Sequence, residues 1–389
     1  MRILPYGHQS INKADIREVV RILNSDWLTQ GPCAEIFERK LVRYCGAKYA
    51  VVVSSGTAAL HLACLTAGLK TGNEAITTPL TFLATPNSVL YTGAKPVFVD
   101  INAKTVNIDP YKIEKQITRK TKVILPVHFA GLPCDMPKIH TIVRKNNQIV
   151  IEDAAHALGA KYKSDNRWIK IGSCRHSDMT VFSFHPIKSI TTGEGGAITT
   201  NNKRFYDHLL MLRNHGIYKD KGVQSQKPWF YEMRELGFNY RLTDFQCALG
   251  ISQLGRIGQF IQKRRHLTQY YKQLLRGING LSVIDEPQGL ESSCHLFLVR
   301  IQFAKFKTTR PIAMKELKRR GINAQVHYIP IYQQPYYRKN LGYQYRQYPL
   351  AEDFYNEALS IPLFADMKEG DVRYVVKNLL DLLVKAKRG

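Results

Sequence analysis

The sequence predicts an α/β protein whose large domain holds a mostly parallel central sheet flanked by helices, followed by a smaller α+β domain. Two observations carry this prediction. Short apolar runs alternate with helical patterns over the first two thirds of the chain, which is typical of parallel sheets. At 389 residues the chain also exceeds the size that a single hydrophobic core usually serves.

The elements follow in order along the chain. Apolar residues spaced by three and four predict an amphipathic helix over residues 15–24. Short apolar runs predict strands at 49–53, 96–99, 122–127, 149–151, 179–184 and 197–200. Helical patterns between them cover 55–65, 82–91, 137–145 and 202–213.

The pattern changes after Gly237. A helical pattern covers much of 242–275, broken by glycines at 255 and 258, and it is followed by a strand at 295–303 and helices at 311–320 and 371–384. We place the domain boundary near residue 255, which gives domains of 1–255 and 256–389.

Composition excludes several classes of protein. The hydrophobic share of 44% and the charged share of 22% are those of a globular chain. No apolar run reaches the length of a membrane span, and the first residues lack a signal-peptide core, so we expect a cytoplasmic protein without membrane contact. The seven cysteines are scattered without metal-like spacing, which favours buried reduced thiols and no metal site.

The formal net charge of +25 has two interpretations. It is compatible with nucleic-acid binding or with attraction of anionic small molecules. Because the basic residues are spread along the chain without a nucleic-acid-binding motif, we expect a solvated face or a field that attracts a phosphorylated substrate.

Three segments carry chemistry. Gly56, Thr57 and Ala58 open a helix directly after a strand, where free backbone amides favour an anion, although an ordinary capped helix would look the same. Asp153 follows an apolar strand, where α/β proteins place ligands, although a surface acid is the commoner case. Lys188 follows a further strand and precedes a glycine-rich turn.

Together these segments meet the needs of pyridoxal 5′-phosphate (PLP). The helix start and Ser183 suit the phosphate, Asp153 suits the pyridine nitrogen, and Lys188 suits the aldehyde, with which it would form a Schiff base. Phe82 is the candidate to cover the ring, although core packing explains a phenylalanine almost as well.

The chain resembles the DegT/DnrJ/EryC1/StrS family of sugar-nucleotide aminotransferases, which are fold-type-I PLP enzymes. The matching segments are LTQGP (28–32), SGTAA (55–59), TFLAT (81–85), PVHFAG (126–131), EDAAH (152–156), FSFHPIK (182–188), GEGG (193–196), RNHG (213–216) and LGFNYR (236–241). The resemblance implies that Lys188 is catalytic and that the cofactor is bound by Gly56, Thr57, Ala58, Phe82, Asp153, His156, Ser183, Lys188 and Asn239.

Two of these implied roles, those of Asn239 and His156, depend on more than a contact with the cofactor within one chain. Asn239 would reach the phosphate of a neighbouring subunit, so that a homodimer would complete each site. His156 stands where many members have glutamine, near the cofactor's phenolic oxygen, and its charge state adds a pH dependence that the sequence leaves open.

A narrower resemblance concerns the transaminases of pseudaminic acid biosynthesis, through LPYG (4–7), SDWLTQGP (25–32) and QVHYIP (325–330). It implies ping-pong amination of the C4 ketone of a UDP-4-keto-6-deoxy-N-acetylhexosamine, with L-glutamate as donor and 2-oxoglutarate as product. The implied substrate contacts are Tyr6, Asp26, Trp27, Leu28, Thr29, His327, Tyr328, Ile329 and Pro330.

Three alternatives stay open. Another nucleotide-sugar transaminase would make a bacillosamine-type, lipid A or dTDP-linked amino sugar. A sugar dehydratase of the same fold would lack the lysine, and Lys188 is present. A non-catalytic sensor or nucleic-acid-binding protein would have no need of Lys188, Asp153 and the phosphate turn together.

Overall fold

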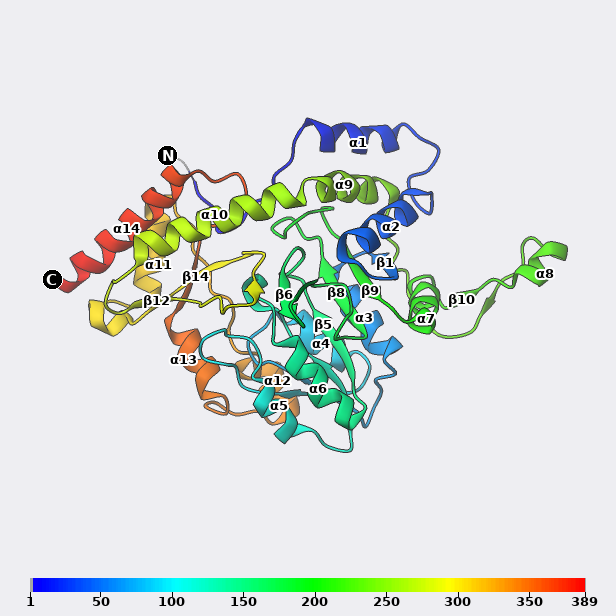
Figure 1. Ribbon diagram of the computed structural model, residues 1–389, viewed down its shortest axis with the longest axis horizontal. Coiled ribbons are helices and arrows are strands. Elements are labelled where there is room, and N and C mark those ends of the chain that lie inside the picture. Colours follow the sequence, from blue (N-terminus) through cyan, green and yellow to red (C-terminus); the bar gives the residue numbers. More distant parts are fainter. Residues whose placement is uncertain (1–2, 389) are drawn as a thin grey trace.

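The computed structural model of the chain describes residues 3–388, and a seven-stranded sheet forms its centre (Figure 1). The strand order is β1-β9-β8-β5-β4-β2-β3. The bounds are β1 (Tyr49–Val53), β2 (Glu74–Thr77), β3 (Lys95–Phe98), β4 (Thr121–Leu125), β5 (Ile149–Asp153), β8 (Met179–Ser183) and β9 (Gly196–Thr200). Only β9 runs against its neighbours, β1 and β8, so the prediction of a mostly parallel sheet is confirmed.

Helices cover both faces of this sheet because both faces are apolar. Along β1, Ala50 and Val52 belong to one hydrophobic cluster, whereas Val51 and Val53 belong to another. The first cluster includes residues of α2 (Cys33–Cys45), α6 (Met136–Asn146) and α9 (Asp244–Gly255). The second includes residues of α3 (Gly56–Thr66), α4 (Ala84–Leu90) and α7 (Lys203–Arg213). This arrangement is the buried parallel sheet of α/β proteins.

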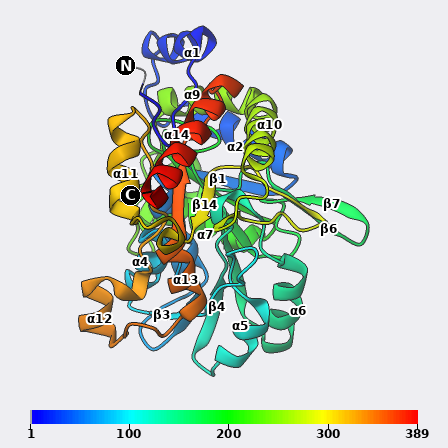
Figure 2. The same ribbon diagram turned by 90° about the vertical axis from the view of Figure 1, so that its left-hand side faces the viewer.

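A second, antiparallel sheet lies in the C-terminal part of the chain. It has the order β12-β14-β15 and shares a hydrophobic cluster with residues of three helices, α10, α11 and α14, all of which are labelled in Figure 2. The bounds are α10 (Ile257–Leu275), β12 (Leu281–Val283), β14 (Phe297–Ile301), α11 (Arg310–Arg319), β15 (Ala358–Ile361) and α14 (Glu369–Arg388).

The N-terminal residues contact both parts of the chain. Leu4 pairs with Ile322 in a parallel bridge, while α1 (Lys13–Leu23) lies along α9 and its Asp15 accepts hydrogen bonds from Ser252 and Gln253. The division into 1–255 and 256–389 stays a prediction.

A thin arm extends from the end of the sheet near α7 (Figure 1). It consists of β10 (Ile217–Tyr218), α8 (Lys221–Gln226) and β11 (Glu232–Met233), with the two strands paired antiparallel. The side chains of Trp229 and Leu236 are 76% and 78% exposed there. We call residues 217–236 the arm.

Smaller elements complete the chain. They are α5 (Pro110–Gln116), β6 (Lys161–Ser164), β7 (Arg167–Lys170), β13 (Leu290–Glu291), α12 (Pro335–Leu341) and α13 (Pro349–Glu357). The seven cysteines are free and buried, as predicted. Between residues 3 and 388, no helix is long and apolar enough to cross a membrane.

One prediction of a helix break was wrong. The helical pattern over 242–275 is interrupted once, between Gly255 and Ile257, whereas Gly258 lies inside α10. A glycine within a helix costs only about 1 kcal/mol relative to alanine, and the packing of Leu267 and Tyr271 in the core outweighs it.

Candidate active site

The predicted cofactor residues meet at the carboxyl edge of the large sheet. Asp153 ends β5, Ser183 ends β8, and the start of α3 follows β1 at the same edge. They border a cavity of about 460 Å³. Its lining is Tyr6, Ser55, Gly56, Thr57, Leu60, Thr81, Phe82, Ala84, Thr85, Val127, Asp153, Ala155, His156, Ser183, His185, Ile187, Lys188, Glu194, His327 and Tyr328.

The start of α3 forms an anion cradle. The Ser55 hydroxyl accepts a 3.0 Å hydrogen bond from the Ala58 amide and caps the helix. The amides of Gly56 and Thr57 have no partner within the helix, so they and the helix dipole favour a negative charge. A Cβ on Gly56 would lie 2.8 Å from Cβ of Ser183, so only glycine lets these two segments approach closely.

Asp153 is held by two hydrogen bonds that orient its carboxylate. The Thr85 hydroxyl donates to Oδ2 at 2.7 Å, and the Ala155 amide donates to Oδ1 at 3.1 Å. Thr85 is itself 2.8 Å from the hydroxyl of Thr81, one helical turn earlier. Asp153 is only 5% exposed, so its orientation is fixed by these contacts rather than by solvent.

Lys188 lines the same cavity beyond β8. Its backbone amide donates to the carbonyl of His185 at 2.9 Å, which closes the turn after the strand. Burial lowers the pKa of the Lys188 ammonium to about 8, while the nearby Asp153 carboxylate acts in the opposite direction. A neutral, nucleophilic amine is therefore available much closer to neutral pH than for a solvated lysine.

His156 contacts residues from the C-terminal part of the chain. Its Nε2 lies 3.2 Å from the hydroxyl of Tyr328, and its ring centroid lies 4.4 Å from that of His295. Burial, followed by the charge of Lys188, lowers the pKa of His156 well below its usual value. Both effects favour a neutral ring.

Aromatic rings form the outer wall of the cavity. Phe82 is 56% exposed, so it is not a core residue, and its ring centroid lies 6.0 Å from that of Tyr328. The ring of Tyr6 lies 5.3 Å from that of His327, whose Nδ1 is 2.7 Å from the Ser360 hydroxyl. Tyr6, His327 and Tyr328, three of the predicted substrate contacts, therefore meet beside Lys188.

The remaining predicted contacts do not line this cavity. Asp26, Trp27, Leu28 and Thr29 lie exposed between α1 and α2, where the Leu28 carbonyl accepts from the Asp244 amide. Ile329 and Pro330 follow Tyr328 without reaching the cavity, and Asn239 lies at the root of the arm, bridged to Asn214. Their roles stay predictions.

Sequence reasoning missed several lining residues. Thr85 could have been predicted, because it carries a hydroxyl and lies in the segment 81–85, four residues after Thr81. In the structure this hydroxyl donates to the Asp153 carboxylate. His185, Ile187 and Glu194 come together only through the turn that follows β8. Their segments, 182–188 and 193–196, match the family, but nothing in the sequence gives these three side chains a role of their own.

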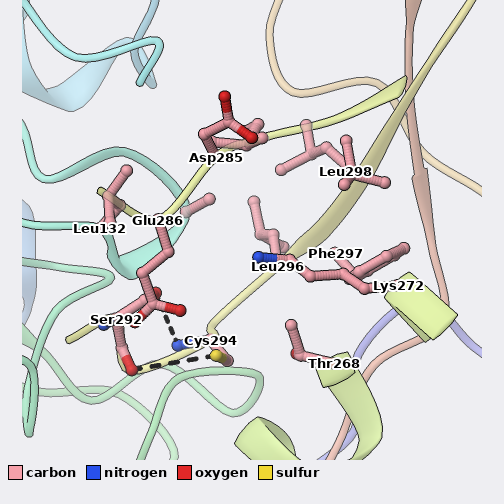
Figure 3. Close-up of a pocket in the computed structure, with 13 residues that line it drawn as sticks. Leu132, Thr268, Lys272, Asp285, Glu286, Ser292, Cys294, Leu296, Phe297 and Leu298 are labelled. Atoms are coloured by element: carbon pink, nitrogen blue, oxygen red, sulfur yellow. Dashed lines mark hydrogen bonds between the residues drawn. The ribbon is translucent and has the colours of Figure 1, made fainter. Parts of the chain in front are cut away.

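A second hollow has none of the predicted residues in its lining. Figure 3 shows it between β14 and the end of α10, with Cys294 beside Thr268 and the Glu286 carboxylate turned toward the backbone of Ser292. Its volume of about 50 Å³ suits a few water molecules rather than a cofactor. Of these two hollows, the cavity around Lys188 is the one whose lining suits a cofactor.

Comparison with protein families and known sequences agrees with this geometry. The model of the DegT/DnrJ/EryC1/StrS aminotransferase family matches residues 9–380. The spore coat polysaccharide biosynthesis protein SpsC of Bacillus subtilis is 38% identical over 383 residues, which cover 98% of this chain and 97% of that protein. A UDP-4-amino-4,6-dideoxy-N-acetyl-beta-L-altrosamine transaminase of Campylobacter jejuni is 38% identical over 390 residues, covering 100% and 99%.

Solved structures agree as well. Helicobacter pylori PseC, an aminotransferase of pseudaminic acid biosynthesis, superimposes with a TM-score of 0.90 at 32% identity and covers 99% of this chain and 100% of its own. A sugar aminotransferase described as putative, Spr1654 of Streptococcus pneumoniae, gives 0.91 at 32% identity in its PMP form, with coverage of 98% and 100%. The same protein is also known in a PLP form.

Proposed function

Because the chain belongs to the DegT/DnrJ/EryC1/StrS aminotransferase family and is a PLP-dependent sugar aminotransferase, we propose that it aminates C4 of a UDP-4-keto-6-deoxy-N-acetylhexosamine. L-Glutamate would be the donor, and the products would be UDP-4-amino-4,6-dideoxy-N-acetyl-β-L-altrosamine and 2-oxoglutarate. The observation that carries this choice of sugar is the 38% identity with the Campylobacter jejuni transaminase over 390 residues.

The residues around the cavity fit the cofactor. Gly56, Thr57 and Ser183 would hold its phosphate, because amides and a hydroxyl converge in a cradle that a Cβ would fill. Asp153, already oriented by Thr85, would pair with the pyridine nitrogen. When bound, PLP supplies an electron sink and carries the amino group from one substrate to the other.

Lys188 would work in two ways. Its amine would bind the cofactor's aldehyde and would give way to the amino group of a substrate. Its Nζ then takes the α-proton of glutamate, and in the second half of the reaction Nζ returns a proton to C4 of the sugar. The lowered pKa of Lys188 supports both tasks, because a neutral amine can attack the aldehyde and can accept a proton.

Assembly as a homodimer forms part of the proposal. Trp229 and Leu236 of the arm expose large apolar side chains. The arm itself extends away from the body of the chain (Figure 1). The arm's root carries Asn239, and the carbonyl of the adjacent Tyr240 accepts from the Ser54 amide beside the phosphate cradle. In the dimer that the resemblance implies, Asn239 of one copy would reach the phosphate held by the other. The expected cytoplasmic location stays a prediction.

A second sugar has comparable support. The identity with SpsC, a protein of spore coat polysaccharide biosynthesis, is also 38%, so a different sugar from that of the Campylobacter jejuni transaminase is the second candidate. The two candidates share the cofactor chemistry and differ only in the sugar.

The deciding experiment offers a panel of UDP- and dTDP-linked 4-keto sugars to the purified enzyme with L-glutamate, and follows the products by NMR. We expect amination of the UDP-4-keto-6-deoxy-N-acetylhexosamine to a product with the β-L-altro configuration. A chain that aminates only dTDP-linked sugars, or gives a different configuration at C4, overturns the proposed substrate. The Lys188→Ala variant is the control, since it keeps the pocket and loses the amine.

A further inference from the structure

A cavity of about 670 Å³ lies between the starts of α5 and α6 and the hairpin of β6 and β7, and it is larger than the one around Lys188. These elements lie on one side of the molecule (Figure 2). The lining is Asn102, Thr105, Asn107, Ile108, Asp109, Pro110, Tyr111, Pro133, Cys134, Asp135, Pro137, Tyr162, Lys163, Trp168, Pro287, Gln288, Gly289 and Leu290. None of these residues lines the cavity around Lys188, and the volume is within the range of about 300–1,000 Å³ of small-molecule sites. We call it the Trp168 cavity.

Two aromatic rings of the Trp168 cavity are open to solvent. Tyr111 and Trp168 are 69% and 44% exposed. The Nζ atom of Lys138 lies 4.8 Å from the ring centroid of Tyr111. The Nζ atom of Lys161 lies 4.8 Å from the ring centroid of Trp168 and is also paired with the Glu291 carboxylate at 3.2 Å. Both rings are therefore positioned before a ligand binds, and their negative faces attract C–H groups such as those on one face of a sugar ring.

The wall of the cavity is held in place by Asn107. Its Nδ2 donates to the carbonyls of Leu132 and Pro133 at 3.0 Å each, and its Oδ1 accepts from the Phe129 amide at 2.9 Å. Prolines, whose rings fix φ, form a further part of the wall: Pro110, Pro133, Pro137 and Pro287. A cavity with fixed walls is largely formed before a ligand enters, which lowers the entropic cost of binding.

Polar side chains of the lining offer both acceptors and donors to a ligand. Oδ1 of Asp109 accepts from the Tyr111 amide at 3.0 Å. Oδ1 of Asp135 accepts from the Lys138 amide at 3.1 Å. The second oxygen of each carboxylate has no hydrogen-bond partner among the described residues, so it is free to accept from a ligand. The Lys163 ammonium adds a donor.

The charges around the cavity nearly cancel. The carboxylates of Asp109 and Asp135 are accompanied by the ammonium groups of Lys163, in the lining, and Lys138, over the exposed tyrosine. An anionic ligand would be repelled by the two carboxylates, and a cationic one by the two ammonium groups. Hydroxyl groups donate and accept hydrogen bonds without carrying charge. The cavity therefore favours an uncharged ligand that is rich in hydroxyls.

We propose that the Trp168 cavity binds an uncharged sugar, with the sugar ring stacked on Trp168 and its hydroxyl groups bound by Asp109 and Asp135. The open aromatic rings, the free carboxylate oxygens and the balanced charges together select this chemical class. The site is separate from the cavity around Lys188, so the inference does not rest on the proposed function.

Binding is tested by isothermal titration calorimetry of the full chain loaded with PLP. The probes are N-acetylglucosamine, its disaccharide N,N′-diacetylchitobiose and the cationic glucosamine. We expect a Kd on the order of 1 mM for N-acetylglucosamine, as for other small polar ligands, and weaker binding of glucosamine. Tighter binding of the disaccharide assigns the cavity to a saccharide chain, and equal or weaker binding assigns it to a free sugar. No binding of either uncharged probe, or a preference for glucosamine, overturns the proposal.

Substitutions of Trp168 test where the sugar binds. Trp168→Ala removes the ring and should weaken the binding of N-acetylglucosamine on the order of tenfold, whereas Trp168→Phe keeps a ring and should bind within about threefold of the wild type. Tyr336, which is 59% exposed and lies outside the cavity, provides the matched control. Tyr336→Ala should bind the sugar as the wild type does. Equal affinities of Trp168→Ala and the wild type place the sugar elsewhere and overturn the proposal.

A substitution of Asp135 separates the loss of an acceptor from damage to the fold. Asp135→Asn keeps an oxygen that caps α6 and replaces the free acceptor with a donor. We expect weaker binding of N-acetylglucosamine, with the absorption spectrum of bound PLP and the free energy of unfolding as in the wild type. Wild-type affinity for the sugar in this variant overturns the part of the proposal that concerns the carboxylates.

Discussion

The Thr85 hydroxyl donates a 2.7 Å hydrogen bond to Oδ2 of Asp153 inside the buried floor of the cavity. Thr85 lies on α4 and Asp153 at the end of β5, so this bond fixes the carboxylate relative to the helix that follows Phe82. A hydrogen bond to a charged group contributes about 1.5–3 kcal/mol. The orientation of Asp153 therefore depends on a residue outside its own strand.

Replacing Thr85 with valine removes the hydroxyl and keeps the shape of the side chain. We expect the affinity for PLP to fall on the order of tenfold, because the carboxylate loses its donor and turns more freely. Titration of the cofactor-free protein with PLP measures the change. Thr85→Ser keeps the hydroxyl and should bind PLP as tightly as the wild type does. A Thr85→Val variant with the wild-type affinity for PLP would contradict the role of this bond.

Capture of the cofactor by Lys188 should depend on pH with a midpoint near 8. Because burial lowers the pKa of Lys188 to about 8, the neutral amine that attacks the aldehyde accumulates as the pH rises through 8 and is complete above about 9. Stopped-flow absorbance at pH 6–10 measures the rate. A rate that still rises at pH 10 would be typical of a solvated lysine and would contradict a pKa of Lys188 lowered by burial. As a control, Lys188→Ala should show no capture of the cofactor.

Adding a methyl group at Gly56 should damage the anion cradle. The Cβ of Gly56→Ala would lie 2.8 Å from Cβ of Ser183, so the helix start and β8 must separate. We expect weaker binding of PLP with little change for pyridoxal, which lacks the phosphate; both affinities are measured by titration.

Gly258→Ala is the matched control, because a Cβ there meets no atom within 4 Å. This variant should bind PLP normally and gain up to about 1 kcal/mol of stability in α10. Equal losses of affinity for PLP and pyridoxal in Gly56→Ala would show general damage rather than loss of the cradle.

The buried pair of His128 and Glu152 should matter for stability. His128 Nε2 lies 2.8 Å from the Glu152 carboxylate, and both side chains are almost fully buried. His128→Leu leaves a buried carboxylate without this partner, which typically costs about 3–5 kcal/mol of the free energy of unfolding. Chemical denaturation measures it, with His208→Ala at the exposed pair with Glu235 as a control that should cost about 0–1 kcal/mol.

The sign of the pH effect on this pair follows from Glu152. Burial raises its pKa, but hydrogen bonds from His128, Ser177 and Thr180 outweigh burial and leave the pKa below its usual value. Its contribution to stability is therefore present above the pKa of the unfolded chain and is lost as the pH falls through the folded pKa. The cost of His128→Leu should shrink on acidification; a constant cost would indicate lost packing instead.

Polar substitutions on the arm should separate the proposed dimer. In the double variant Trp229→Ser and Leu236→Ser, two large exposed apolar side chains are lost while the sheet is untouched. We expect the mass measured by sedimentation to fall from that of a dimer, twice 44.5 kDa, to that of one chain. We also expect weaker PLP binding. A wild-type chain that sediments as a monomer and still turns over would contradict the shared site.

Much of the fold could be predicted because its signals are local. Ala50, Val51, Val52 and Val53 alternate between two hydrophobic clusters, so an uninterrupted apolar run already indicated a strand covered on both faces. The helix start at Gly56 was visible because the cap, Ser55, is its neighbour in the sequence. Gly258 was misread because its effect on α10 depends on packing by distant residues.

By itself, the sequence predicted the chemistry that this chain carries: an amine at Lys188, a carboxylate at Asp153 and a helix start suited to an anion, which indicate PLP only when they are taken together. Only the tertiary structure decided how these groups are tuned. The lowered pKa of His156 arises from burial. The bond from Thr85 to Asp153 and the contact of Tyr328 with His156 join residues that are 68 and 172 positions apart. Burial and such distant contacts exist only once the chain is folded, so no local pattern records them.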